Sequence, residues 1–157
     1  MNFLKNMEIN NVLSVSDIME YHKNRYPWFF VDRISFVSDG IVEGIKLFSA
    51  NEFYAKGSSK GSFVPSFIVG EALEQTALMT FMEKKSEMLT NTISSDMEYF
   101  RELVYGDVLC IRAELQYFRR GVAKVFVSGS VDGDIIGKGI FVIAVPEVMN
   151  MFLPKSN

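Results

Sequence analysis

One long apolar segment constrains the fold of this chain more than any other feature. The segment starts at Phe67, and its first residues place apolar side chains on nearly every face of a helix. A helix that is apolar almost all round belongs inside a fold, covered on several sides. Pro65 and Ser66 supply an N-terminal boundary, so we expect one buried helix from Phe67 to about Glu87.

The hydrophobic period then changes from helical to two. Between Val108 and Tyr117 the odd positions are mostly apolar, whereas the even positions include Arg112, Glu114 and Gln116. This alternation is typical of a strand with one buried and one solvated face. Further strands are predicted at residues 29–37, 41–48, 122–131 and 135–145, and a short helix is predicted at residues 16–20.

These elements predict an α+β protein in which one long helix packs against a single antiparallel sheet of about five or six strands. A sheet wrapped around a nearly all-apolar helix is the hot-dog arrangement. The 157 residues show no internal repeat or linker, so residues 1–157 are expected to form one domain.

Composition excludes several classes of protein. With 48% hydrophobic residues and a net charge of -3, the chain is neither disordered nor suited to binding nucleic acid. The N-terminus has no apolar core of a signal peptide, and no run of about 18 apolar residues could span a membrane. We therefore expect a cytoplasmic protein without a membrane span.

The chain contains one histidine, His22, and one cysteine, Cys110. These two residues can form neither an internal disulfide nor a structural zinc site, and no metal or other cofactor is expected. Histidine is the usual general base near neutral pH. Either His22 performs the chemistry, or the chain performs none that needs an imidazole of its own. A surface or helix-end position is the expected place of His22.

Several segments resemble bacterial 3-hydroxyacyl-acyl-carrier-protein dehydratases of the FabZ/FabA type. Residues 25–33 resemble the family segment RYPFLLVDR, residues 51–52 its NEPFF start, and residues 65–75 its segment PGVLIVEALAQ. Residues 100–107 resemble FRRPVVPGD, and residues 131–133 match the VDG turn. The segments follow the family order. They imply a hot-dog fold, and a dimer whose sheets join edge to edge with active sites at the subunit interface.

The chain departs from the family where the catalytic histidine should be. The family pattern is GHFPGRPIMPG, and residues 57–66 read GSSKGSFVPS. Gly57 keeps the first glycine, Ser58 falls on the histidine, and Ser66 replaces the glycine at the start of the helix. His22 precedes the RYP segment and lies outside the motif.

Dehydration needs a base for the proton on C2, an acid for the oxygen leaving C3, and donors for the enolate oxygen. By its position in the resemblance, Glu71 takes the acid role. The N–H groups of Ser66 and Phe67 are the expected enolate donors. Gln75, one turn beyond Glu71 on the same face, and Phe63 are also expected to contact the substrate. A serine is no base, so Ser58 is not expected to act as one.

The resemblance implies an acyl carrier protein, with its phosphopantetheine-linked acyl chain, as the partner that carries the substrate. The candidate contacts to this carrier protein are Lys56, Lys60, Arg101, Arg119 and Arg120. The alternative is that these residues are scattered, solvated surface charges. Candidate lining of an acyl tunnel consists of Phe63, Phe67, Met79 and Met82.

Three functions are consistent with these residues. In the family each site is implied to combine the histidine of one subunit with the acid of the other. A FabZ-like dehydratase subunit, in fatty-acid or polyketide-type synthesis, would therefore be a homodimer or a heterodimer completed by a histidine-bearing homologue. A non-catalytic acyl-thioester-binding or scaffolding subunit is the alternative. A hot-dog thioesterase is a third, for which no carboxylate is identified.

Overall fold

The computed structural model describes residues 11–57, 59, 61–85 and 87–153. Its helices are α1 (Val15–Ile18), α2 (Ser66–Leu78) and α3 (Pro146–Asn150), with a 3₁₀ turn, η1, at Phe53–Ala55. Its strands are β1 (Val12–Leu13), β2 (Arg33–Ser38), β3 (Ile41–Leu47), β4 (Asn91–Tyr99), β5 (Val108–Arg119), β6 (Val122–Val131) and β7 (Asp134–Ala144). The strands form one antiparallel sheet in the order β1-β2-β3-β5-β6-β7-β4.

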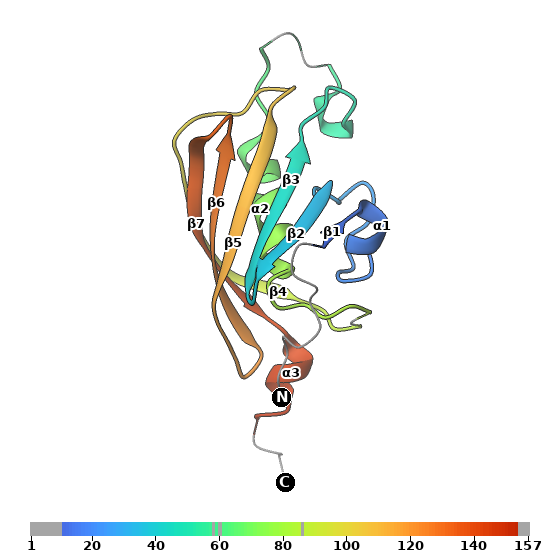
Figure 1. Cartoon of the computed structure of the whole chain (residues 1–157), viewed down its shortest axis with the longest axis vertical. Helices are drawn as coiled ribbons and strands as arrows, with labels where there is room; N and C mark the ends of the chain where they lie inside the picture. Colours follow the sequence, from blue (N-terminus) through green and yellow to red (C-terminus); the bar gives the residue numbers. More distant parts are fainter. Residues whose placement is uncertain (1–10, 58, 60, 86, 154–157) are drawn as a thin grey trace.

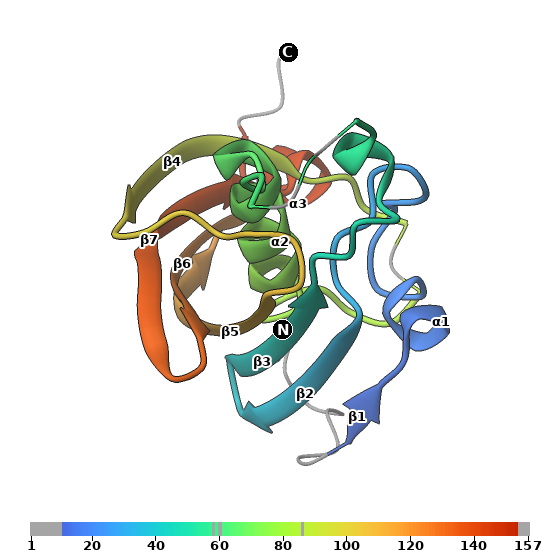
Figure 2. The same cartoon turned by 90° about the horizontal axis from the view of Figure 1, so that it is seen from above.

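The sheet curls around α2, which confirms the hot-dog fold (Figures 1 and 2). The inner faces of β5 and β6 bury Leu109, Ile111, Val125 and Val127 in the same hydrophobic core as the helix. At Gly44 of β3, an added Cβ would lie 2.6 Å from the Thr76 hydroxyl of α2. The glycine therefore lets this strand approach the helix directly.

The helix α2 is shorter than predicted, because it ends at Leu78 and continues only as a tight turn. The N–H groups of Met79 and Thr80 bond to carbonyls three residues back, and the Thr80 hydroxyl also donates to the carbonyl of Ala77. Phe81 and Met82 stay buried within this turn, and the next residues are Glu83 and two lysines, which offer no further apolar side chain for the helix to bury.

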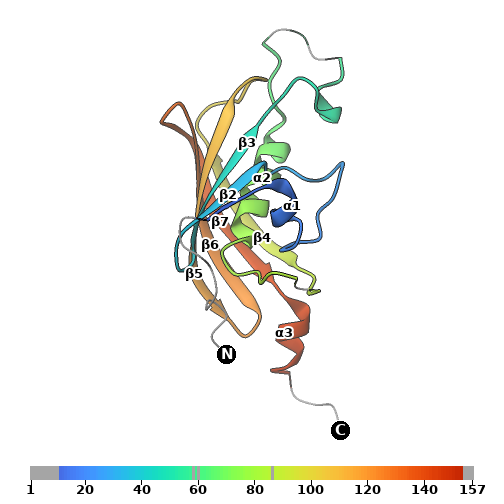
Figure 3. The same cartoon turned by 45° about the vertical axis from the view of Figure 1, so that its right-hand side comes forward.

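Two strands lie beyond those predicted. Strand β1 has two residues, and β4 forms an edge of the sheet beside β7. Every residue of β4 except Met97 is exposed, so its sequence lacks the burial alternation by which the other strands were predicted. The small helix α1 lies on the same side of the sheet as α2 (Figure 3), and its Ser14 cap donates from its N–H and hydroxyl to Asp17.

Candidate functional site

The start of α2 is fixed by contacts on both sides. The N–H of Val64 donates to the carbonyl of Leu103 at 2.7 Å, which holds the segment before the helix against the chain leading into β5. The hydroxyl of Tyr99, the last residue of β4, donates to the carbonyl of Ser66 at 3.3 Å. Within the described chain the N–H groups of Ser66 and Phe67 make no hydrogen bond. They are the unpaired donors of a helix N-terminus, where the macrodipole favours negative charge.

Glu71 lies one turn further along α2 and is held by two amides. Gln75 Nε2 donates to Glu71 Oε1 at 2.8 Å, and Asn24 Nδ2 donates to the same oxygen at 3.4 Å. From the described residues, Oε2 receives no hydrogen bond. The carboxylate is therefore oriented through one oxygen and has the other open.

Gln75 itself is fully buried and uses both ends of its amide. Its Oε1 accepts the N–H of Phe30 at 2.8 Å, and its Nε2 also donates to the carbonyl of Trp28 at 3.3 Å. The side chain thus connects the segment that resembles RYPFLLVDR to Glu71. All of its hydrogen-bonding atoms have protein partners, so this amide is placed to hold Glu71 and has no free atom for a substrate.

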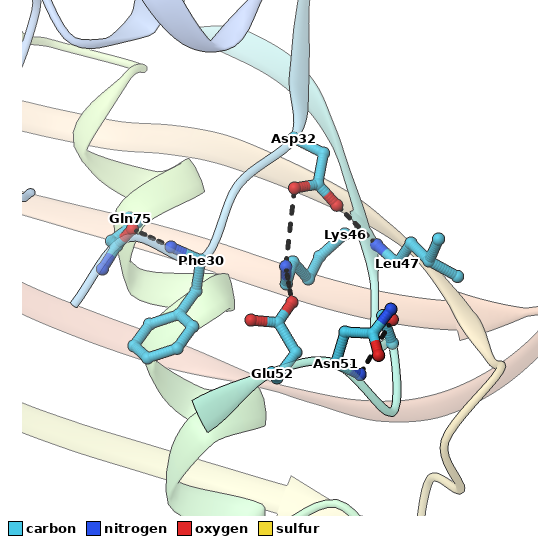
Figure 4. A network of polar contacts seen from close by, with 8 residues as sticks. Phe30, Asp32, Lys46, Leu47, Asn51, Glu52 and Gln75 are labelled. Carbon is cyan, nitrogen blue, oxygen red and sulfur yellow. Dashed lines mark hydrogen bonds and ion pairs between the residues drawn. The ribbon is translucent and has the colours of Figure 1, made fainter. Parts of the chain in front are cut away.

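A second polar network fixes the end of β3, where the chain enters the loop between β3 and α2 (Figure 4). The Nζ of Lys46, a buried lysine, lies 2.5 Å from Glu52 Oε1 and 3.4 Å from Asp32 Oδ1. The other oxygen of Asp32 accepts the N–H of Leu47 at 2.7 Å. A buried ammonium needs such partners, and here they connect the end of β3 with both the loop and the chain before β2.

Beyond η1 the hydrogen bonds of the described residues 57–62 are local, and contact with the rest of the sheet resumes at Phe63, which bridges to Val104. Gly57 and Gly61 have positive φ angles of 82° and 81°, and the N–H of Ser59 donates to the hydroxyl of Ser62 at 2.9 Å. Ser58, at the position of the family histidine, lies outside the described residues, as does Lys60. The described residues of this segment carry no group that could act as a base near neutral pH.

Two hollows meet at the start of α2. One, of about 380 Å³, is lined by Phe63, Ser66, Tyr99 and Arg101 among others. The other, of about 350 Å³, runs between α2 and β4 and is lined by Ser66, Phe67, Gly70, Glu71, Glu74, Ser95, Met97, Tyr99 and Phe141. The predicted site residues Ser66, Phe67 and Glu71 therefore share one cavity, Phe63 lies at the adjoining one, and Gln75 lies behind Glu71.

Sequence reasoning missed Glu74. Its carboxylate lines the same hollow as that of Glu71 and accepts a hydrogen bond from the hydroxyl of Thr92 on β4. Burial raises the pKa of Glu74, and the nearby charge of Glu71 raises it further, although the Thr92 hydroxyl opposes both effects. The only signal in the sequence was a glutamate where the family segment PGVLIVEALAQ has an alanine.

His22 is buried, with only 3% of its surface exposed, so the expectation of a surface histidine is wrong. Its ring stacks on Phe29 at 5.5 Å, and neither ring nitrogen has a hydrogen-bond partner among the described residues. Burial lowers its pKa to about 4, and the charge of Arg25 acts in the same direction. The ring lines neither of the two hollows.

The predicted cationic residues do not form one patch. Arg101 lines the first hollow and pairs with Asp107 at 3.3 Å, just before β5 begins. Arg119 and Arg120 lie at the opposite end of β5, which at about 3.3 Å per residue is more than about 30 Å away. Met79 and Met82, predicted for an acyl tunnel, are buried beyond the end of α2 and line neither hollow.

Within the described ranges, no group of histidine, cysteine, aspartate and glutamate side chains could hold a metal ion. None of the described helices is long and apolar enough to cross a bilayer.

Comparisons with known proteins bear on the family and the fold. The chain is 31% identical to the 3-hydroxyacyl-[acyl-carrier-protein] dehydratase FabZ of Acetivibrio thermocellus over 141 residues, which cover 87% of this chain and 90% of that protein. It is 28% identical to the FabZ of Listeria monocytogenes over 142 residues, covering 87% and 99%. The solved dehydratase heterocomplex ApeI:P from Xenorhabdus doucetiae has the same fold, with a TM-score of 0.68 and 13% identity over 88% of this chain and 98% of that one. No protein-family profile matches the chain.

Proposed function

Because the chain belongs to the FabZ family of 3-hydroxyacyl-[acyl-carrier-protein] dehydratases, we propose that it is a dehydratase subunit that supplies the acid half of an active site. The observation that carries this proposal is the environment of Glu71. Its carboxylate is held through Oε1 by Gln75 and Asn24, and it lines a hollow beside the unpaired N–H groups at the start of α2.

In the proposed reaction each group has one task. An imidazole from another chain takes the proton from C2 of the 3-hydroxyacyl thioester. The N–H groups of Ser66 and Phe67 stabilise the negative charge that develops on the thioester oxygen. The C3–O bond then breaks, and the departing hydroxide receives a proton held at Glu71 Oε2, so that water leaves and a double bond joins C2 and C3.

The missing base requires a second kind of chain. Removing a general base costs about 10²–10⁴-fold in rate, so two copies of this chain should dehydrate poorly. Strand β4, an exposed edge of the sheet beside the Glu71 hollow, offers unpaired backbone groups to another strand. A histidine-bearing FabZ homologue paired on this edge would bring its base towards Glu71. A solved dehydratase of the same fold is itself a heterocomplex.

The second candidate is a subunit that binds acyl thioesters without turnover, as a scaffold for its partners. It is favoured by the serine at position 58. The two functions differ in one result. A dehydratase subunit forms enoyl product when mixed with the histidine-bearing FabZ of its own source, at a rate above that of either protein alone. A scaffold binds the acyl carrier protein under the same conditions without raising that rate.

Substrate delivery should depend on Arg101. It is the one cation of the predicted set found beside the hollows among the described residues, and its guanidinium could meet the phosphate of the pantetheine arm. We expect Arg101→Ala to weaken binding of the acyl carrier protein more than Arg119→Ala, which changes a residue at the far end of β5. Equal effects of the two variants would argue against an entrance at Arg101.

A further inference from the structure

The hollow between α2 and β4 has two fixed ends. Thr92, near the start of β4, donates its hydroxyl to Glu74, and Tyr99, at the end of β4, donates to the carbonyl of Ser66. The strand therefore runs beside the helix in the opposite direction, as Figure 2 shows it passing close to α2. Both residues on the helix line the hollow, which thus extends along α2 from Ser66 to Glu74.

The distance along the helix sets how much chain the hollow can hold. From Ser66 to Glu74 there are eight residues, or about 12 Å at 1.5 Å per residue. Glu71 is five residues after Ser66 and three residues before Glu74, so only about 4.5 Å of helix separates it from Glu74. An acyl chain whose C3 oxygen meets Glu71 has room for only a few methylene groups before it reaches Glu74.

The end of the hollow is polar, whereas Phe67, Met97 and Phe141 give its walls apolar surface. A longer alkyl chain would have to separate the Glu74 carboxyl group from the Thr92 hydroxyl. The carboxyl group would then be buried against methylene groups. Burying a polar group without its hydrogen bond is unfavourable, and more so for a carboxylate than for a neutral carboxyl group.

We propose that Glu74, held by Thr92, closes the acyl hollow and selects short 3-hydroxyacyl chains over long apolar ones. This rests on the proposed function, because it takes the same hollow as the place of the acyl chain. The residue acts on the length of the chain that fits and takes no part in the proton transfers.

The test measures binding, so it does not depend on turnover. The full chain, in its natural oligomeric state, is titrated calorimetrically with 3-hydroxyacyl pantetheine amides of four and ten carbons, which resist hydrolysis. We expect the wild-type chain to bind the four-carbon amide at least as tightly as the ten-carbon amide. Glu74→Ala opens the end of the hollow. Each newly buried methylene group raises the affinity about fourfold, so burying two of them should strengthen binding of the ten-carbon amide more than tenfold.

Three further variants separate the causes. Glu74→Gln keeps a side chain that can bond to Thr92 and should retain the preference for the short amide. Thr92→Val frees Glu74 and should shift the preference in the same direction as Glu74→Ala, by a smaller factor. Glu98→Ala removes an exposed carboxylate from the same strand and should change neither affinity.

Two results would overturn the proposal in different ways. Tighter binding of the ten-carbon amide by the wild-type chain, or an unchanged ratio in Glu74→Ala, would show that Glu74 does not limit length, while the acyl-binding function stands. Failure of both amides to bind the wild type and Glu74→Ala would overturn this proposal together with the function on which it rests.

Discussion

The two halves of the candidate site are built differently. Glu71 is on a buried helix, where Gln75 and Asn24 orient it, and Gln75 is in turn fixed by the backbone of residues 28–30. In the segment that carries the family's histidine position, the described residues from Gly57 to Ser62 bond to one another through Ser59 and Ser62, and Phe63 then bridges to Val104. The acid half, Glu71 with Gln75 and Asn24, is thus tied to the core, while the described residues of the other half are mostly exposed.

This difference shows which parts of the site contribute to folding. Gln75 accepts the N–H of Phe30, which would otherwise be buried without a partner, so this side chain stabilises the fold as well as orienting Glu71. The described residues 57–63 of the loop contribute little to the core, so substitutions there should leave the fold intact. Substitutions in the two halves should therefore differ in stability.

The largest effect is expected at Gln75. In Gln75→Leu the buried N–H of Phe30 loses its acceptor and Glu71 loses its shortest hydrogen bond, while the volume is nearly kept. We expect the free energy of unfolding to fall by about 3 kcal/mol, measured by urea denaturation. A loss below about 1 kcal/mol would contradict the view that the acid half is part of the core.

Acid should destabilise the folded chain through His22. Its pKa is lowered from 6.5 to about 4 in the folded chain, so the unfolded chain binds the proton more readily. The free energy of unfolding is therefore unaffected by the titration of His22 above pH 6.5. It falls by about 3 kcal/mol as the pH falls from 6.5 towards 4.

The control for this effect is His22→Phe, which keeps a ring against Phe29 but cannot titrate. Its unfolding free energy should change less between pH 6.5 and 4 than that of the wild type. NMR titration of the His22 ring in the folded chain provides a direct check. A folded-state pKa near 6.5 would contradict the buried, neutral ring.

A smaller loss is expected where the loop joins the core, at Lys46. Lys46→Met leaves Asp32 and Glu52 without their shared cation, although both carboxylates are partly exposed and solvent can screen them. We expect a loss of about 1–2 kcal/mol and faster amide exchange in residues 52–55. Unchanged exchange there would show that the ion pairs do not fix the start of the loop.

The smallest effect is expected within the loop. Ser62→Ala removes the hydroxyl that accepts the N–H of Ser59, on the surface and close in sequence. The unfolding free energy should change by less than about 0.5 kcal/mol. A loss comparable to that of Gln75→Leu would remove the distinction between the two halves.

The sequence predicted most of the fold because burial and period coincide in its central elements. The apolar start of α2 reflects a helix that is covered on several sides, and the alternation of β5 and β6 follows from one face of each strand meeting the core. Strand β4 could not be predicted in this way, since its residues are exposed and its place is set by pairing with β7. The end of α2 was overestimated because Met79 and Met82 stay buried after the helix has become a turn.

For the site, motif resemblance placed Ser66, Phe67 and Glu71 around one hollow, but side-chain partners were beyond its reach. Gln75 was expected to meet substrate, and only the fold shows that its amide is used by Phe30, Trp28 and Glu71. The hydrogen bond of Glu74 comes from Thr92, which lies far from it in the sequence. The buried ring of His22 packs against Phe29, several residues further along the chain. Tertiary contacts of this kind leave no periodic signal.

The central claim is that Glu71 of this chain works with the base of another chain. The direct measurement mixes the chain with the histidine-bearing FabZ of its source, in which the partner's own acidic residue has been changed to glutamine, and follows enoyl product from 3-hydroxyacyl carrier protein. We predict product from the mixture, none above background from either protein alone, and loss of the product when Glu71→Gln is used. Full activity of the mixture with Glu71→Gln, or turnover by this chain alone at the rate of the mixture, would contradict it.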